Sequence, residues 1–242
     1  MILIQARDVN YRCDEVNLRG YLAIDENVAG PRPGVLVFHE GLGLGEFAME
    51  RAHRLAGFGY VALAADMFGD RRQASNLQEV ATLVGGLRAE PDKLRARGGA
   101  ALDVLAALPQ VDAGRLAAIG FCFGGSVVLE LAREGADLKA VVSFHGVLTT
   151  KMPAQPGLVK ASVLVCTGVD DPLAPPEQVA DFENEMRTGG VKDWQVIAYG
   201  NTLHGFTNPA ADGSMMRTAL YNAQADLRSW ASMKSLFDEV LT

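Results

Sequence analysis

Short apolar runs alternate with stretches of helical periodicity along most of the chain. The apolar runs are typical of strands covered on both faces, and they span residues 34–39, 60–66, 115–119, 139–146, 161–168 and 194–199. Apolar residues at helical spacing predict helices over about 46–57, 92–108, 126–133 and 176–187. This alternation predicts an α/β fold, a doubly wound and mostly parallel sheet with helices on both faces, as one domain over residues 1–242.

Three further segments complete the predicted architecture. Residues 9–13 and 20–24 have the pattern of an antiparallel hairpin at a sheet edge. Residues 67–92 are less regular, and we expect a loop and a short helix that border a pocket. A long C-terminal helix closes the chain, and its expected buried stripe consists of Leu220, Ala223, Leu227, Trp230 and Phe237.

Composition narrows the possible partners and the compartment. The net charge of −7 argues against nucleic acid and anionic membranes, because both bind basic surfaces. No apolar run reaches the ~18 residues of a membrane span, and the first residues lack the pattern of a signal peptide. The cysteines Cys13, Cys122 and Cys166 form neither a metal motif nor a disulfide framework, so we expect a reducing, cytoplasmic location. We also expect a monomer or small homo-oligomer.

The stretch GFCFGG at 120–125 lies between a predicted strand and a predicted helix. A residue at such a turn with glycines two positions before and after it has the pattern of a nucleophile elbow. Gly120 and Gly124 meet the requirement for small residues at the sharp turn. The nucleophile position holds Cys122, and the following helix N-terminus favours its thiolate.

Four polar residues follow separate apolar strands and should meet at the carboxyl edge of the sheet. They are Glu40, Cys122, Asp171 and His204. The order nucleophile, acid, histidine is that of the α/β-hydrolase triad. In these roles Cys122 attacks a carbonyl carbon, His204 transfers the proton, and Asp171 orients the imidazole.

The residues alone leave some of these roles open. Asp170 competes with Asp171 for the acid on equal terms. His145 also ends a strand, but we interpret it as structural because the triad base is expected late in the chain. Cys166 lies within a strand and is interpreted as a core residue.

The oxyanion that forms on the substrate requires preorganised donors. The backbone N–H of Phe123 is one candidate, and that of Gly41, in the loop after the first buried strand, is the other. Glu40 is unusual beside such a site, since a carboxylate repels the developing charge. It is either an ion-pair partner of a nearby arginine or a partner of the Cys122 thiol.

Six motifs, in this order, resemble the dienelactone hydrolase (carboxymethylenebutenolidase) family. They are HEG (39–41), ADMFG (65–69), GFCFGG (120–125), DPLAP (171–175), HGF (204–206) and ADLRSW (225–230). The resemblance implies an eight-stranded α/β-hydrolase fold and a triad of Cys122, His204 and Asp171 rather than Asp170. It also implies that Glu40 contacts the resting thiol and helps to generate the thiolate when substrate binds.

The resemblance further implies an enzyme that opens a lactone or ester through an acyl-cysteine, without a metal or organic cofactor, in the catabolism of aromatic compounds. Members of this family are expected to bind a substrate carboxylate with two arginines. No arginine occurs in residues 204–208, and the second arginine falls in a region where Arg71, Arg72 and Arg88 are candidates together with Arg95. This departure favours an alternative, a general carboxylesterase or thioesterase; a non-catalytic thiol sensor or binding protein is the second alternative.

Overall fold

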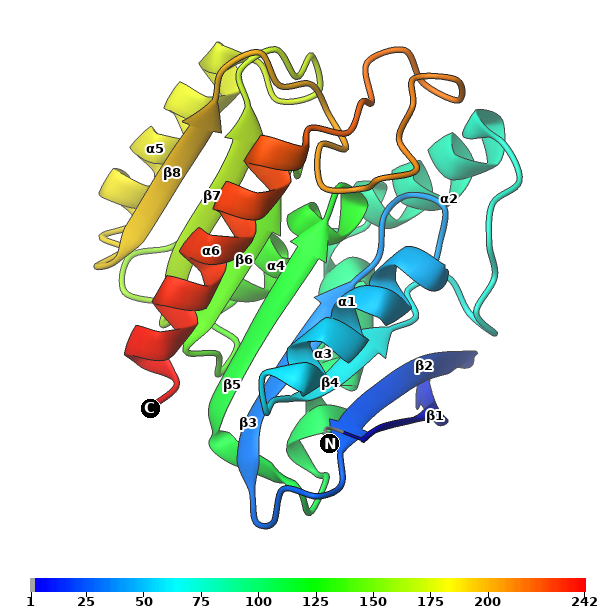
Figure 1. The fold of residues 1–242 in the computed structure, drawn as a ribbon. Coiled ribbons are helices and arrows are strands. Elements are labelled where there is room, and N and C mark those ends of the chain that lie inside the picture. The colour runs from blue at the N-terminus through cyan, green and yellow to red at the C-terminus, as the bar shows by residue number, and fades with distance from the viewer. Residues whose placement is uncertain (1–2) are drawn as a thin grey trace.

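Eight strands form a single sheet in the computed structural model, which describes residues 3–242 (Figure 1). The strands are β1 (Ile4–Cys13), β2 (Val16–Asp25), β3 (Arg32–Phe38), β4 (Val61–Ala65), β5 (Val111–Phe121), β6 (Ala140–Phe144), β7 (Ser162–Gly168) and β8 (Trp194–Tyr199). Their order is β1-β2-β4-β3-β5-β6-β7-β8. The pairs β1–β2 and β2–β4 are antiparallel and the others are parallel, which confirms the predicted sheet.

Helices cover both faces of the sheet (Figure 1). They are α1 (Glu46–Gly57), α2 (Leu77–Ala89), α3 (Pro91–Ala106), α4 (Phe123–Arg133), α5 (Pro176–Thr188) and α6 (Ala223–Val240). Apolar side chains of α1 and α6 pack on one face, and those of α3, α4 and α5 pack on the other. None of the helices within residues 3–242 is long and apolar enough to cross a membrane.

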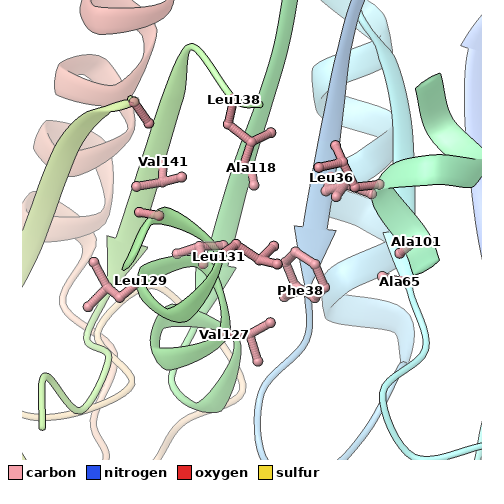
Figure 2. Packing of buried hydrophobic residues seen from close by; sticks show 14 of the residues in the cluster. Leu36, Phe38, Ala65, Ala101, Ala118, Val127, Leu129, Leu131, Leu138 and Val141 are labelled. Atoms are coloured by element: carbon pink, nitrogen blue, oxygen red, sulfur yellow. The ribbon is translucent and has the colours of Figure 1, made fainter. Parts of the chain in front are cut away.

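Helix α4 is buried along its whole length, although one of its faces carries charged residues. Figure 2 shows Val127, Leu129 and Leu131 of α4 in the same apolar layer as Ala118 of β5 and Val141 of β6. Burial of one such side chain stabilises the fold by about 1.5–3 kcal/mol. The N-terminus of α4 is therefore held in a fixed place at the carboxyl end of β5.

The hairpin at the sheet edge is confirmed, and it is longer than predicted. Pairing runs from Ile4 opposite Asp25 to Cys13 opposite Val16. The region 67–92 differs from the expected loop and short helix, because it contains the 13-residue α2 and the start of α3. Leu87 is the buried residue of α2, so its apolar periodicity is too sparse to indicate a full helix.

The buried stripe of α6 was predicted correctly at Trp230 and Phe237. Leu220 lies before the helix with 45% of its surface exposed, Leu227 is 67% exposed, and Ala223 is also exposed, so these three predictions are wrong. The helix instead buries positions on the other side of Trp230. These positions are Ala225, Asp226, Ser229, Met233 and Leu236.

Candidate active site

Cys122 occupies a strained turn between β5 and α4. Its backbone has φ 53° and ψ −112°, a conformation that a residue with a side chain rarely adopts. A Cβ atom at Gly120 would overlap the carbonyl group of Gly124, and one at Gly124 would overlap that of Phe38. The two glycines therefore permit the close backbone approach that the elbow requires, as the sequence indicated.

Hydrogen bonds to residues at the ends of β6 and β3 hold the backbone of the elbow. The N–H of Cys122 donates to the carbonyl oxygen of Phe144 at 3.0 Å and to Nδ1 of His145 at 3.1 Å. The N–H of Gly124 donates to the carbonyl oxygen of His39 at 3.0 Å. Bonds to two adjacent loops thus hold the strained turn and offset its conformational cost.

The structure places Asp171, rather than Asp170, against His204. The Nδ1 atom of His204 lies 2.8 Å from an Asp171 carboxylate oxygen, and both side chains are buried. The other carboxylate oxygen of Asp171 accepts the N–H of Leu173 at 2.8 Å. Asp170 is exposed to solvent. The buried carboxylate fixes one orientation of the imidazole, with Nε2 facing away from it.

The Nε2 atom of His204 is buried and has no hydrogen-bond partner within residues 3–242. Burial lowers the pKa of His204, but the nearby Cys122 thiolate and the hydrogen bond to Asp171 outweigh it and raise the pKa to about 10. The imidazole thus carries a proton at neutral pH when Cys122 is ionised. Cys122, His204 and Asp171 together have the arrangement expected of a nucleophile, a proton carrier and an orienting acid.

His145 lies beside the triad as a second, neutral histidine. Its Nδ1 accepts the N–H of Cys122, so the ring proton lies on Nε2, which donates to Oγ1 of Thr207 at 2.8 Å. The ring packs edge-on against His204 with 5.1 Å between centroids. Burial and the charge of His204 lower the pKa of His145 well below its usual value. His145 therefore joins the elbow to the loop that carries His204.

Arg51 of α1 holds the same loop from the opposite side. Its guanidinium donates to the carbonyl oxygen of Thr207 at 2.6 Å and pairs with Asp226 of α6 at 3.4 Å. The guanidinium also lies over the rings of Phe47 and Trp230. The sequence placed Arg51 in a predicted helix, but it gave no sign that this side chain reaches the loop after His204.

Within the described residues Glu40 makes no hydrogen bond or ion pair with an arginine or with the Cys122 thiol, so neither predicted interaction is present. Its carboxylate accepts the side-chain N–H of Asn208 at 2.6 Å. Burial raises the pKa of Glu40, and the opposing influences of Asn208, His204 and Arg51 do not cancel it. Asn208 lies in the segment after His204 that lacks an arginine, so a neutral amide provides the contact.

Two backbone N–H groups are free to bind an oxyanion. Neither the N–H of Phe123 nor that of Gly41 donates a hydrogen bond within residues 3–242. Phe123 directly follows the nucleophile at the start of α4. A Cβ atom at Gly41 would lie 2.8 Å from the Val80 side chain, so glycine lets α2 pack over this loop.

The three candidate arginines lie in different places. Arg71 is bound at the hairpin, where it pairs with Asp8 at 2.6 Å and donates to the carbonyl oxygen of Gly20, so the structure does not bring it to the triad. Arg72 is exposed. Arg88 of α2 donates to Oγ1 of Thr149 at 2.8 Å, and burial lowers its pKa although the charge of Cys122 acts in the opposite direction.

The model of the Dienelactone hydrolase family matches residues 18–241. The chain belongs to the dienelactone hydrolase family. A putative carboxymethylenebutenolidase of Escherichia coli K12 is 30% identical over 208 residues, which are 78% of this chain and 73% of that protein. These matches identify a hydrolase.

Solved structures agree with this assignment. A dienelactone hydrolase-like promiscuous phosphotriesterase, P91 from metagenomic libraries, is 45% identical, with a TM-score of 0.94 over 99% of both chains. A putative dienelactone hydrolase from Klebsiella pneumoniae, 23% identical with a TM-score of 0.80 over 98% of this chain and 99% of that one, shares the fold.

We predict that the pKa values of the two neighbouring histidines are shifted in opposite directions, upward for His204 and downward for His145. His204 should stay protonated at neutral pH and lose its proton only as the pH approaches about 10, whereas His145 should remain neutral below its ordinary pKa. Nuclear magnetic resonance of labelled imidazoles measures both. Substitution Cys122→Ala should lower the pKa of His204, since the thiolate is gone. Titration of both rings near pH ~6.5 would contradict the arrangement.

Proposed function

We propose that the protein hydrolyses a lactone or carboxylic ester through an acyl-cysteine intermediate on Cys122. The observation that carries the proposal is the buried imidazole of His204, which is bound to Asp171 at Nδ1, has no hydrogen-bond partner at Nε2 within residues 3–242, and has its pKa raised by the charge of Cys122. A structural histidine would have its second nitrogen hydrogen-bonded, because an unpartnered buried polar atom costs free energy.

Acylation begins when the Cys122 thiolate attacks the carbonyl carbon of the substrate. The carbonyl oxygen becomes an oxyanion, which the N–H groups of Phe123 and Gly41 bind. The tetrahedral intermediate then expels the alkoxide, which takes the proton from Nε2 of His204 and leaves as an alcohol, or as a hydroxyl on the same molecule in a lactone. The acyl group remains on sulfur as a thioester, and His204 becomes neutral.

Deacylation reverses these roles. Neutral His204 takes a proton from water, and the hydroxide formed attacks the thioester carbon. The second tetrahedral intermediate releases the carboxylic acid and the Cys122 thiolate, and His204 is again protonated. Asp171 stabilises the imidazolium in both steps through the 2.8 Å hydrogen bond.

Glu40 acts, in this proposal, on the ionisation of Cys122 rather than on the substrate. Burial raises the pKa of Glu40, so its carboxylate is a stronger base than an exposed glutamate and is suited to accept a proton from a group of the site. The hydrogen bond from Asn208 holds the carboxyl in place in the resting protein. A substrate that displaces this contact allows Glu40 to accept the proton of Cys122 in molecules in which the cysteine is not yet ionised, which agrees with the role that the family resemblance implies.

The substrate class follows from the segment after His204. Asn208 provides no positive charge where the family resemblance led us to expect an arginine. We therefore propose an ester or lactone outside the dienelactones, including aryl esters and thioesters, as the substrate rather than an intermediate of aromatic catabolism. The name of the 45% identical relative adds a second candidate, the hydrolysis of neutral phosphotriesters.

A thiol sensor or binding protein on the same fold is the remaining alternative. A sensor requires an accessible cysteine, but it needs neither the buried Asp171–His204 pair nor two free N–H groups beside the sulfur. These additional features favour the enzyme.

We predict that Cys122→Ala lowers kcat/KM for a chromogenic aryl ester by at least about 10³-fold. Cys122→Ser should also be poor, because the serine hydroxyl is much less acidic than the thiol. Initial rates with p-nitrophenyl acetate measure both effects, and Cys166→Ala is the matched control, since this thiol is buried with its pKa raised to about 12.

Equal rates for wild type and Cys122→Ala would exclude the cysteine mechanism. An intact wild type that turns over no ester or thioester would instead favour the sensor. The same variants assayed with a neutral phosphotriester test the second candidate. Multiple turnovers that depend on Cys122 would support it, whereas a single phosphorylation without turnover would exclude it.

We predict that Glu40→Gln leaves the melting temperature nearly unchanged and slows acylation by about 10²-fold. The glutamine oxygen can still accept the Asn208 hydrogen bond, but its amide cannot accept the thiol proton. The initial burst of aryl alcohol measures acylation, and Asn208→Ala is the control that breaks the hydrogen bond while keeping the carboxyl. A loss of stability with an unchanged burst rate would show that Glu40 is structural.

A further inference from the structure

The buried imidazole of His39 connects two of the sequence motifs, HEG (39–41) and ADMFG (65–69), and has no role in the chemical steps described above. The residue directly follows β3. Its ring packs against that of Phe68 with 4.8 Å between centroids and against that of Phe123 with 6.0 Å. Because Phe123 is the residue after the nucleophile, His39 lies beside the elbow.

Two hydrogen bonds fix the ring of His39 and its tautomer. The backbone N–H of Met67 donates to Nε2 at 3.3 Å. A ring nitrogen that accepts a hydrogen bond carries no proton, so the proton of the neutral ring lies on Nδ1. This Nδ1 lies 2.6 Å from the carbonyl oxygen of Glu40 and therefore donates to it. Burial lowers the pKa of His39, so the ring stays neutral.

The ADMFG segment holds this ring in place through Asp66. One carboxylate oxygen of Asp66 accepts the N–H groups of Phe68 at 2.9 Å and of Gly69 at 3.1 Å. These bonds fix the turn after β4, from which the Met67 N–H reaches the imidazole of His39. The carboxylate thus supports the ring indirectly, through the backbone that it organises.

The hydrogen bond from His39 to Glu40 sets the direction of the next N–H group. The peptide bonds of the described residues are trans, so the C=O of Glu40 and the N–H of Gly41 point in opposite directions. Since the imidazole holds the carbonyl oxygen, the Gly41 N–H points away from the imidazole. The N–H of Gly43 donates to the same oxygen at 3.2 Å. Rotation of this peptide would therefore break two hydrogen bonds.

The backbone of His39 holds the other half of the oxyanion site. Its carbonyl oxygen accepts the N–H of Gly124 at 3.0 Å, and Gly124 directly follows Phe123. The end of β3 lies so close to this turn that a Cβ atom at Gly124 would be 2.2 Å from the carbonyl oxygen of Phe38. His39 thus holds the elbow with its backbone and the Gly41 peptide with its side chain.

We propose that His39 is a positioning residue that holds the two oxyanion donors, the N–H groups of Gly41 and Phe123, in a fixed relation to each other. The proposal rests on the proposed function, because it specifies what prepares the oxyanion site of that reaction. Donors that need no reorientation when charge develops on the substrate oxygen lower the barrier most. The imidazole acts through the backbone and does not touch the substrate.

Two substitutions separate the roles of the ring nitrogens. In His39→Asn the amide nitrogen takes the place of Nδ1 and can donate to Glu40, whereas the bond from Met67 is lost. In His39→Gln the amide oxygen takes the place of Nε2 and can accept from Met67, whereas the donor to Glu40 is lost. The control is His53→Gln, because His53 of α1 bonds to the hydroxyl of Tyr21 at 2.7 Å and contacts neither motif.

His39→Gln should lower kcat and kcat/KM for p-nitrophenyl acetate by the same factor, about 30-fold, which is part of the effect of losing a whole oxyanion donor. His39→Asn should stay within about threefold of wild type, and His53→Gln should be unchanged. Melting temperatures are measured for all three variants.

A merely structural histidine would give rates that follow the melting temperature. A loss in His39→Asn that equals or exceeds the loss in His39→Gln would therefore overturn the proposal, as would an unchanged rate in His39→Gln. An equal loss in His53→Gln would show a general effect of reduced stability and would also overturn it.

The wild type provides a test even if neither His39 variant folds. Nitrogen-15 magnetic resonance of the labelled imidazole should show the neutral ring with its proton on Nδ1. A proton on Nε2, or an imidazolium at neutral pH, would overturn the proposal, because the Met67 N–H would then have no acceptor.

A trifluoromethyl ketone distinguishes failure of the positioning role from failure of the proposed function. The Cys122 thiolate attacks the ketone carbon, a carbon–sulfur bond forms, and the carbonyl electron pair moves to the oxygen, which becomes a hydroxyl when it takes up a proton. The pKa of this hydroxyl, measured by carbon-13 magnetic resonance, should be about one pH unit higher in His39→Gln than in wild type and His39→Asn.

An equal hydroxyl pKa in wild type and His39→Gln would overturn the positioning role. A wild type that forms the adduct but turns over no ester would contradict the proposed function and leave the positioning role supported by the difference in pKa. A wild type that forms no adduct would contradict both.

Discussion

The backbone of Cys122 is the constraint on which the rest of the site depends. The residue has a positive φ of 53° and must stay there for its sulfur to project from the sheet edge. Its N–H is held by Phe144 and His145, and the turn closes because Gly120 and Gly124 have no side chains. A wholly buried α4 prevents the turn from relaxing. The position of Cys122 is thus fixed by backbone packing, independently of the side chains of His204 and Asp171.

The arrangement of charges around this turn is asymmetric. His204 lies between two anionic groups, Asp171 and the Cys122 thiolate, which raise its pKa. His145, 5.1 Å from it, is kept neutral by burial and by that same positive charge. One histidine can therefore carry the proton while the other only holds the backbone, since a second charge at this distance would be repelled.

The sequence was sufficient for the fold and for the candidates Cys122 and His204, whereas Asp171 was preferred to Asp170 only through the family resemblance. Strand and helix order, the elbow glycines and the positions of Cys122 and His204 after their strands follow from local patterns. The region of α2 was predicted poorly because this helix buries mainly Leu87. Leu227 was assigned to the core because it lies at helical spacing from Trp230, but the helix buries the other side of Trp230.

Contacts between distant segments could not be predicted in the same way. Glu40 and Asn208 are 168 residues apart, and His145 and Thr207 are 62 apart. Nothing local in the sequence indicates that these side chains meet. The sequence did not distinguish Arg88 from the other candidate arginines. The fold alone shows that α2, which carries Arg88, lines a cavity together with α4. These are contacts that depend on how loops are placed, whereas the triad depends on where strands end.

The most direct test of the proposed mechanism is the mass of the protein during turnover. An ester that deacylates slowly is mixed with the wild type, the reaction is quenched at early times, and the intact protein and its peptides are weighed. We predict an added acyl group on the peptide that contains Cys122, formed and lost at rates compatible with kcat. Product release without any adduct, or an adduct on a different residue, would contradict the acyl-cysteine mechanism.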